Sequence, residues 1–258
     1  MNHFTHNDFL ENEITVLLAG CGGSGSFMMA ELSHLHDLLT RLGHKGLKVI
    51  AYDPTHVRDS NLGRQKFRAA DIGKNKAECL IHYQRQWNGF THWEAHSEAL
   101  TSRIIERKYM NYGVTPTILI TAVDLPSVRS DFGKIKDRSA GRAFYWLDLG
   151  NDSDSGQVVL GGLAGSNELP NAYDLFGSQY DNMKDSDSKS CSTAEALAKQ
   201  DFGVNGAAAH HGVTLLWRLL RHGGLEHHGV FFNVAKGEAI PMQIDPKLWA
   251  TYGYVANK

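Results

Sequence analysis

A cluster of glycines placed directly after a short apolar run is the feature that most constrains the fold of this chain. Residues 14–19 (ITVLLA) are continuously apolar, as expected of a strand buried on both faces of a parallel sheet. They run into GCGGSG at residues 20–25, and apolar residues then recur at helical spacing over residues 26–42. Glycines allow a tight turn and a close approach to a phosphate, and the N-terminus of the following helix favours negative charge. The candidate phosphate-binding residues are Gly20, Gly22, Gly23 and Gly25. A simple strand-to-helix turn is the alternative.

A second apolar run and an acidic residue complete a recognisable unit. Residues 47–52 (LKVIAY) predict another buried strand, and Asp53 follows at its end. In nucleotide-binding folds an acidic residue at this place accepts hydrogen bonds from ribose hydroxyls. The alternative is an Asp that caps its own turn. Strand, glycine turn, helix, strand and acidic residue together predict the βαβ unit of a nucleotide-binding fold.

The rest of the chain continues the alternation of strands and helices, which predicts an α/β, doubly wound and mainly parallel Rossmann-like sheet. The further elements expected are strands at 117–123, 143–149 and 157–163, helices at 74–87 and 194–220, and a hairpin at 229–244. We expect residues 1–258 to form a single domain with antiparallel strands near its C-terminus. Segment 166–192 has few aliphatic residues and is expected to be a flexible crossover loop.

Composition and charge argue against several classes of protein. The chain is 42% hydrophobic and 21% charged, as in soluble globular proteins. A net charge of −2 does not indicate direct binding to nucleic acid. No apolar run approaches the ~18 residues of a membrane span. Residues 1–13 lack the apolar core of a signal peptide, so we expect a cytoplasmic protein. Three cysteines are too few for a disulfide framework or a four-cysteine zinc site.

The polar residues that follow Asp53 suit a triphosphate better than a dinucleotide. The sequence NLGRQ occupies residues 61–65, and GKNK occupies residues 73–76. Arg and Lys bind phosphate and stabilise a pyrophosphate leaving group, although each residue alone could be a solvated surface group. Asp124 ends the strand at 117–123, at the sheet edge where ligands bind in such folds. It could hold Mg²⁺ or cap the next helix.

From Gly20 to Asp124 the order of these motifs resembles that of the ThiF/MoeB/HesA family of the ubiquitin-activating superfamily. That family reads strand, G-x-G-G-x-G, strand, Asp, N-L-x-R-Q, G-x-x-K, and a strand ending in Asp. The resemblance implies ATP and Mg²⁺ as cofactors, a small ubiquitin-like protein with a C-terminal Gly as partner, and a homodimer. More narrowly, the residues around Cys191 and Trp217 resemble the ThiF-related branch of the PRTRC cassettes of bacterial plasmids.

Matched position by position, the resemblance implies a role for each motif residue. Asp53 would hold the ribose, and Asp124 would hold magnesium. The residues implied to contact the phosphates are Asn61, Arg64 and Lys76, and Gln65, also among the cofactor-binding candidates, would support that site. Lys74 is a rival to Lys76, but the G-x-x-K register favours Lys76. Arg64, Lys76 and Asp124 are therefore the implied catalytic residues of this region.

The chain departs from the family pattern in two places. Many members carry two C-x-x-C pairs that bind a structural zinc; this chain has none, so zinc is not expected. Many also have an N-terminal Arg that reaches the ATP of a dimer partner, and residues 1–13 contain no Arg. Cys191 matches a position where a family cysteine is acylated or persulfide-linked, so it is a catalytic candidate, with a free loop cysteine as the alternative. Cys21 and Cys79 are expected to be packing residues.

The leading hypothesis is an ATP-dependent adenylyltransferase. The partner's terminal carboxylate would attack the α-phosphate, giving an acyl-adenylate and pyrophosphate. A thiol, with Cys191 as the candidate, would then accept the acyl group. The first alternative is an NAD-dependent oxidoreductase that uses the same glycine loop. The second is a catalytically inactive nucleotide-binding assembly protein, which the missing N-terminal Arg keeps open.

Overall fold

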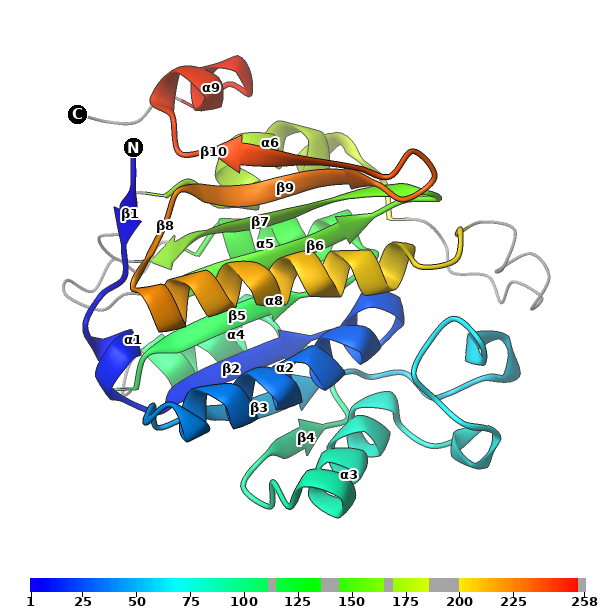
Figure 1. Cartoon of the computed structure of the whole chain (residues 1–258). Coiled ribbons are helices and arrows are strands. Elements are labelled where there is room, and N and C mark those ends of the chain that lie inside the picture. The colour runs from blue at the N-terminus through cyan, green and yellow to red at the C-terminus, as the bar shows by residue number, and fades with distance from the viewer. Residues whose placement is uncertain (111–114, 136–143, 165–168, 186–199, 255–258) are drawn as a thin grey trace.

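Eight strands form one continuous sheet in the computed structural model, which describes residues 1–110, 115–135, 144–164, 169–185 and 200–254 (Figure 1). The strand order is β10-β9-β7-β6-β5-β2-β3-β4. The parallel strands are β2 (Ile14–Ala19), β3 (Leu47–Tyr52), β4 (Glu94–His96), β5 (Thr117–Thr121) and β6 (Phe144–Asn151). The antiparallel strands are β7 (Ser155–Ala164), β9 (His227–Asn233) and β10 (Glu238–Gln243). The predicted parallel sheet with antiparallel C-terminal strands is confirmed. A separate pair, β1 (His3–Phe4) and β8 (Gly224–Leu225), lies at one end of the sheet.

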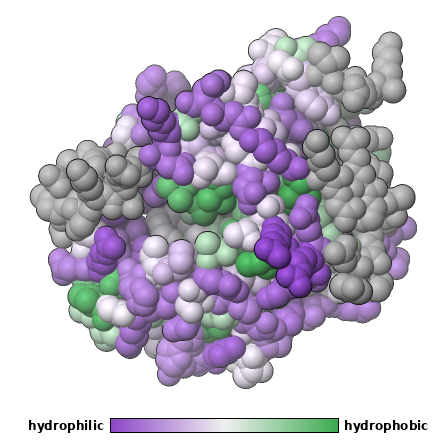
Figure 2. Space-filling model, turned by 180° about the vertical axis from the view of Figure 1, so that it is seen from behind, coloured by the Kyte–Doolittle hydropathy of each residue, from purple (hydrophilic) through white to green (hydrophobic). Residues whose placement is uncertain are grey.

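Helices cover both faces of the sheet, as in a doubly wound fold (Figure 1). On one face lie α2 (Gly23–Arg41), α8 (Val204–His222) and α3 (Lys76–Asn88). On the other lie α4 (Ser102–Ile105), the π-helical turn η3 (Glu106–Met110), α5 (Pro126–Gly133) and α6 (Ala172–Asn182). The shorter elements are α1 (Asp8–Glu11), η1 (Asp59–Asn61), η2 (Ala69–Asp71) and α9 (Pro246–Thr251). Seen from behind, the molecule is mostly hydrophilic, with some hydrophobic areas near the middle of that face (Figure 2). Within the described ranges, no helix has both the length and the apolar character needed to cross a membrane.

The central strand β2 shows why an uninterrupted apolar run belongs here. Ile14, Val16 and Leu18 pack into the core beneath α2 and α8. Leu17 and Ala19 point the other way, into the core that includes Ile105 of α4 and Phe132 of α5. Because successive side chains alternate between faces, a strand covered by helices on both sides needs apolar residues at every position.

Helix α2 begins earlier than its apolar spacing predicts. It starts at Gly23 rather than Ser26, so the second half of the glycine loop forms its first turn. Gly22 precedes the helix and no side chain caps it. The first backbone N–H groups of a helix have no partner within the helix, so this terminus is free to donate to a ligand.

The prediction of a loop over 166–192 is wrong for residues 172–182, which form α6. Asn171 caps this helix, since its side chain accepts hydrogen bonds from the backbone N–H groups of Tyr173 and Asp174. Leu175, Phe176 and Tyr180 carry the buried face. Only a few apolar side chains anchor α6 among many polar ones, and composition alone therefore suggested a loop. Residues 166–168 and 186–192 lie outside the described residues.

A buried histidine joins the antiparallel strands to the C-terminal helix. His228 of β9 is fully buried. Its Nδ1 lies 2.9 Å from Leu160 O, and its Nε2 accepts a hydrogen bond of 2.9 Å from Trp249 Nε1. An indole nitrogen only donates, so Nε2 carries no proton and the ring is the neutral Nδ1–H form. Burial is the largest influence on the pKa of His228 and lowers it to about 4.

This histidine makes the stability of the fold depend on pH. Between pH 6.5 and 4 the unfolded chain binds a proton at this position while the folded chain does not, so acid favours unfolding. The contribution of neutral His228 to the free energy of unfolding is complete above pH 6.5. Because its pKa falls from 6.5 to about 4 on folding, about 3 kcal/mol of that free energy is lost by pH 4. Urea unfolding at pH 7 and 4.5 should show a smaller acid loss in His228→Gln than in the wild type. His34→Gln, at an exposed position, should keep the full loss. Equal losses in all three proteins would contradict the assignment.

Candidate active site

A cavity of about 1200 Å³ opens where the parallel strands end. Its walls come from the loops after β2, β3 and β5 and from the end of β6. In the sheet, β2 lies between β3, which follows it in the chain, and β5, which comes after β4. The strand order therefore reverses its direction at β2. Ligands of open α/β sheets bind at this switch in strand order, outside the carboxyl ends of the strands.

The four glycines of the loop divide into two pairs. Gly20 and Gly22 line the cavity. Gly20 has φ +90°, and a Cβ there would lie 2.5 Å from Ala122 O. Gly23 and Gly25 do not line the cavity; a Cβ on Gly23 would overlap the side chain of Asn205, and one on Gly25 would overlap Gly20 O. The first pair is placed for a ligand, whereas the second allows the loop to pack closely against its surroundings.

Asp53 takes the turn-capping role foreseen as its alternative, and its role towards a ribose stays a prediction. Its carboxylate lines the cavity but is only 5% exposed. Oδ2 accepts from the backbone N–H of Cys21 at 2.7 Å, and Oδ1 accepts from the backbone N–H of Thr55 at 2.7 Å. The side chain therefore ties the glycine loop to the end of β3. A carboxylate offers about four acceptor positions, so capacity for a ribose hydroxyl remains.

Asn61 and Arg64 both line the cavity. Asn61 is buried in η1, and its Oδ1 accepts from the backbone N–H of Arg58 at 2.9 Å. Arg64 is half-buried, and its Nε donates to Ser60 O at 3.2 Å. Its Nη1 donates to Gln200 Oε1 at 3.2 Å. The motif thus delivers a guanidinium to the cavity in a defined orientation.

Gln65 differs from its neighbours in the motif, because it does not line this cavity. It is 8% exposed and lines a separate hollow between α2 and α3. Its Oε1 is buried and has no hydrogen-bond partner among the residues that the structure describes. Its Nε2 lies 3.9 Å from the place a Cβ of Gly22 would occupy. Gln65 therefore backs the glycine loop, and direct contact with a ligand in the cavity is not what its position suggests.

Lys76 and Lys74 differ in exposure and in their position relative to the cavity. Lys76 is the first residue of α3, half-buried, and lines the cavity, whereas Lys74 is exposed and does not. Burial lowers the pKa of Lys76; the charge of Asp53 raises it, and that of Arg64 lowers it again. The register of Lys76 depends on Asn75, which caps α3 and donates to Asp53 O at 2.7 Å.

Asp124 is an exposed carboxylate at the cavity, in the loop between β5 and α5. Helix α5 begins at Pro126 after Leu125 and has no side-chain cap, so the alternative role of Asp124 as a cap is not realised. Its charge acts on both Lys76 and Arg129. The donor is a hard carboxylate oxygen beside two cations, which fits Mg²⁺ bound together with phosphate.

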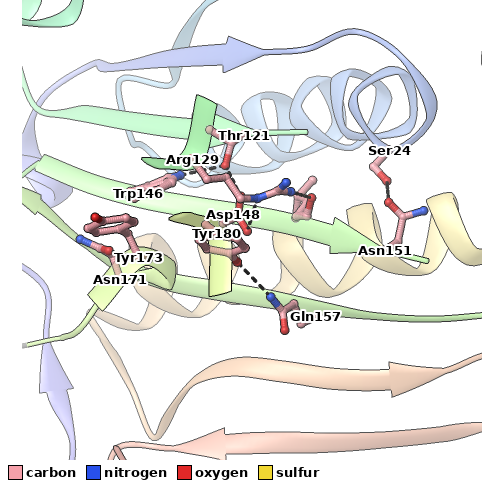
Figure 3. A network of polar contacts seen from close by, with 11 residues as sticks. Ser24, Thr121, Arg129, Trp146, Asp148, Asn151, Gln157, Asn171, Tyr173 and Tyr180 are labelled. Carbon is pink, nitrogen blue, oxygen red and sulfur yellow. Dashed lines mark hydrogen bonds and ion pairs between the residues drawn. The ribbon is translucent and has the colours of Figure 1, made fainter. Parts of the chain in front are cut away.

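A buried ion pair that the motifs did not reveal lies next to the cavity (Figure 3). Arg129 of α5 donates from Nε to both carboxylate oxygens of Asp148, at 2.8 and 3.0 Å. Its Nη2 donates to Leu149 O at 3.0 Å. Thr121 also donates to Asp148, and Trp146 Nε1 donates to Thr121 Oγ1 at 2.8 Å. Burial would lower the pKa of Arg129, but the charge of Asp148 prevails and the pKa is raised. The signal in the sequence was an Asp inside the apolar strand.

The far half of the cavity is built from other residues. The guanidinium of Arg129 lies over the ring of Tyr180 of α6, with 5.6 Å between Arg129 Cζ and the ring centroid. The Tyr180 hydroxyl accepts a hydrogen bond of 3.1 Å from Gln157 Nε2 (Figure 3). Phe231 and Phe232 of β9 complete this wall. Aromatic rings beside a few polar groups are typical of a surface that receives a peptide or another extended ligand.

An amide cluster connects the two long helices at the cavity. Asn205 of α8 is 6% exposed. Its Oδ1 lies 3.1 Å from Ser24 Oγ and 3.2 Å from Asn151 Nδ2, and Ser24 also contacts Asn151 (Figure 3). Asn205 Nδ2 donates to Gln200 Oε1 at 3.3 Å. Sequence reasoning missed this cluster because its members come from three separate segments, and only Ser24 lies in a motif.

The cysteines give no nucleophile within the described part of the chain. Burial raises the pKa of the Cys21 thiol well above its ordinary value and that of Cys79 to about 11, so both suit packing. Cys191 lies outside the described residues. In the described ranges, no three His, Cys, Asp or Glu side chains gather closely enough to hold a metal ion.

The comparisons with known proteins agree with this geometry. PaaA shares the fold, with 18% identity and a TM-score of 0.61 over 92% of this chain and 65% of PaaA. Escherichia coli MccB with ATP gives 16% identity and a TM-score of 0.58 over 92% of this chain and 65% of MccB. MccB in complex with N-formylated MccA gives 16% identity and a TM-score of 0.57 over 92% of this chain and 66% of MccB. The chain thus spans about two thirds of the length of these proteins. No curated protein sequence matches it.

The sequence itself matches a family model. The match covers residues 8–217 and includes every motif from the glycine loop to Asp124. The matched region also includes the residues of the amide cluster. The family model does not distinguish the PRTRC branch from other members of the family, so that narrower assignment stays a prediction. With most of the chain matched by that model, the protein belongs to the ThiF family.

Proposed function

We propose that the protein is an ATP-dependent adenylyltransferase that activates the C-terminal carboxylate of a small ubiquitin-like protein. The observation that supports this most is that Arg64, Lys76 and Asp124 all line one cavity together with Gly20 and Gly22 of the glycine loop. Two cations and a free helix N-terminus suit a triphosphate. MccB has been crystallised with ATP and with the peptide MccA, and this family resemblance supports a nucleotide and a peptide-like acyl substrate here.

The reaction asks the protein mainly for positioning and charge. In our proposal the partner's carboxylate oxygen attacks the α-phosphorus of ATP, and the bond to the bridging oxygen of pyrophosphate breaks. Arg64 and Lys76 stabilise the charge that develops on the leaving pyrophosphate. Asp53 holds the ribose end, and the backbone N–H groups around Gly22 receive phosphate oxygens. Asp124 would hold Mg²⁺, which supplies further positive charge at the phosphates.

The second half of the cavity gives the acyl substrate a place. A cavity of about 1200 Å³ exceeds what a nucleotide alone fills, since ligand pockets of roughly 300–1000 Å³ hold whole drug-sized molecules. Tyr180, Gln157 and the phenylalanines of β9 also line the cavity, and none of them belongs to the motifs assigned to the nucleotide. We infer that the partner's C-terminal tail lies along this wall. Transfer to Cys191 and action as a homodimer belong to the same proposal.

Each alternative predicts a different experimental outcome from that of the proposed enzyme. An NAD-dependent oxidoreductase has no need of Arg64 and Lys76 at the phosphates, because a dinucleotide carries no γ-phosphate. An inactive assembly protein would bind ATP without turning it over. Release of pyrophosphate in the presence of a Gly-ended partner separates this second alternative from the proposed enzyme.

ATP with MgCl₂ should stabilise the protein, and Asp124→Asn should abolish most of that effect. A ligand at about 100 times its dissociation constant adds about 2.7 kcal/mol to the free energy of unfolding. For a domain of this size that raises Tm by about 5–10 °C. Differential scanning fluorimetry measures the shift. The control Asp37→Asn removes the same charge near the C-terminal end of α2, away from the cavity, and should show the same Tm shift with ATP as the wild type. A shift with NAD⁺ and none with ATP would overturn the proposal.

A further inference from the structure

Arg64, the guanidinium of the proposed phosphate site, is held from two sides. Its Nε donates to Ser60 O of its own turn at 3.2 Å. Its Nη1 donates to the side-chain Oε1 of Gln200, which is far away in sequence, at 3.2 Å. A long, flexible side chain loses conformational entropy when a ligand fixes it. Contacts that fix it beforehand lower that cost.

The orientation of the Gln200 amide is itself determined by its surroundings. Asn205 is buried, and its Oδ1 is taken by Ser24 and Asn151, so its Nδ2 faces Gln200. Asn205 Nδ2 and Arg64 Nη1 are both donors, and they meet at Gln200 Oε1, which is the acceptor end of the amide. The next backbone N–H, that of Asp201, donates to Ser153 O at 2.6 Å. The acceptor is therefore anchored to α8 and to the turn between β6 and β7.

The neutrality of this acceptor is what suits it to the site. A carboxylate in the same place would form a charge-assisted bond with Arg64 and would cancel its charge towards a phosphate. An amide orients the guanidinium and leaves the full charge in the cavity. We propose that Gln200 is a positioning residue that holds Arg64 in place for the phosphates of ATP. This inference rests on the proposed function, since it requires the cavity to bind ATP.

Direct nucleotide binding tests the proposal without the acyl partner. Isothermal titration with ATP·Mg should show affinity lowered about fivefold by Gln200→Ala, and by more than tenfold by Gln200→Glu, whose charge competes with phosphate for Arg64. Affinity for AMP, which lacks the β- and γ-phosphates, should change by less than about twofold in both. Gln86→Glu, on the exposed side of α3, makes the same change in charge and should leave both affinities unchanged. Equal losses for ATP and AMP would indicate a general structural defect and would overturn the proposal.

A double-mutant cycle shows whether Gln200 acts through Arg64. In an Arg64→Ala background, Gln200→Ala should cause no further loss of ATP affinity. Full additivity of the two losses would overturn the positioning role. If the wild type binds ATP and neither Gln200 variant changes that affinity, this inference is refuted and the proposed function still stands. Failure of the wild-type protein to bind ATP at all would overturn both.

Discussion

Lys76→Met is expected to weaken binding of ATP·Mg by about ten- to a hundredfold, because a hydrogen bond to a charged group contributes roughly 1.5–3 kcal/mol. Lys76 opens α3, lines the cavity, and has a pKa lowered chiefly by burial. An ammonium that has already lost much of its water has little hydration left to give up when a phosphate arrives. It also acts through a lower effective dielectric constant than an exposed charge does.

Lys74→Met provides the matched control, because it removes the same charge two residues earlier from an exposed position. It should leave the affinity for ATP within about twofold of the wild type, as expected for an exposed charge that is screened by water and salt. Calorimetric titration of both variants at one ionic strength makes the comparison. A large loss in Lys74→Met with none in Lys76→Met would show that the register taken from the G-x-x-K motif is wrong.

The register of that motif illustrates what the sequence could predict. The resemblance to the family favours Lys76 over Lys74 through the G-x-x-K register, and in the structure Lys76, unlike Lys74, lines the cavity. Asn75 caps α3 and also donates to Asp53 O, so the helix starts against the end of β3 with its first side chain in the cavity. The strands were predictable for a similar reason. Burial on both faces leaves continuous apolar runs such as that of β2, which are easy to recognise.

What the sequence did not predict depends on contacts between distant segments. Helix α6 was not predicted because its capping residue and its few buried apolar side chains stand among polar ones. The contact between Gln200 and Arg64 spans 136 positions, and no local pattern marks either partner for the other. Gln65 was placed with the ligand residues because it follows Arg64 in the motif. Adjacent side chains here point to different cavities, and a motif does not show this.

The pair formed by Arg129 and Asp148 was also missed, and its disruption should have the largest effect on stability. Arg129→Met leaves the Asp148 carboxylate buried, with Thr121 as a remaining donor and no opposite charge. Removing one partner of a buried ion pair typically costs about 3–5 kcal/mol. For a chain of this size we expect a fall in Tm of about 10 °C. Lys134→Met, which breaks the exposed pair with Asp181, should leave Tm nearly unchanged.

A second substitution distinguishes a buried orphan charge from simple loss of packing. In Arg129→Met with Asp148→Leu both charges are gone, and apolar side chains of similar size fill the space. Replacing both members of a buried pair in this way is often neutral or stabilising, so most of the lost Tm should return. Asp148 lies on β6 beside Trp146 and next to the cavity wall that Arg129 and Tyr180 share. A double variant as unstable as Arg129→Met would mean that the guanidinium matters through its packing and its bond to Leu149 O rather than through the charge it neutralises.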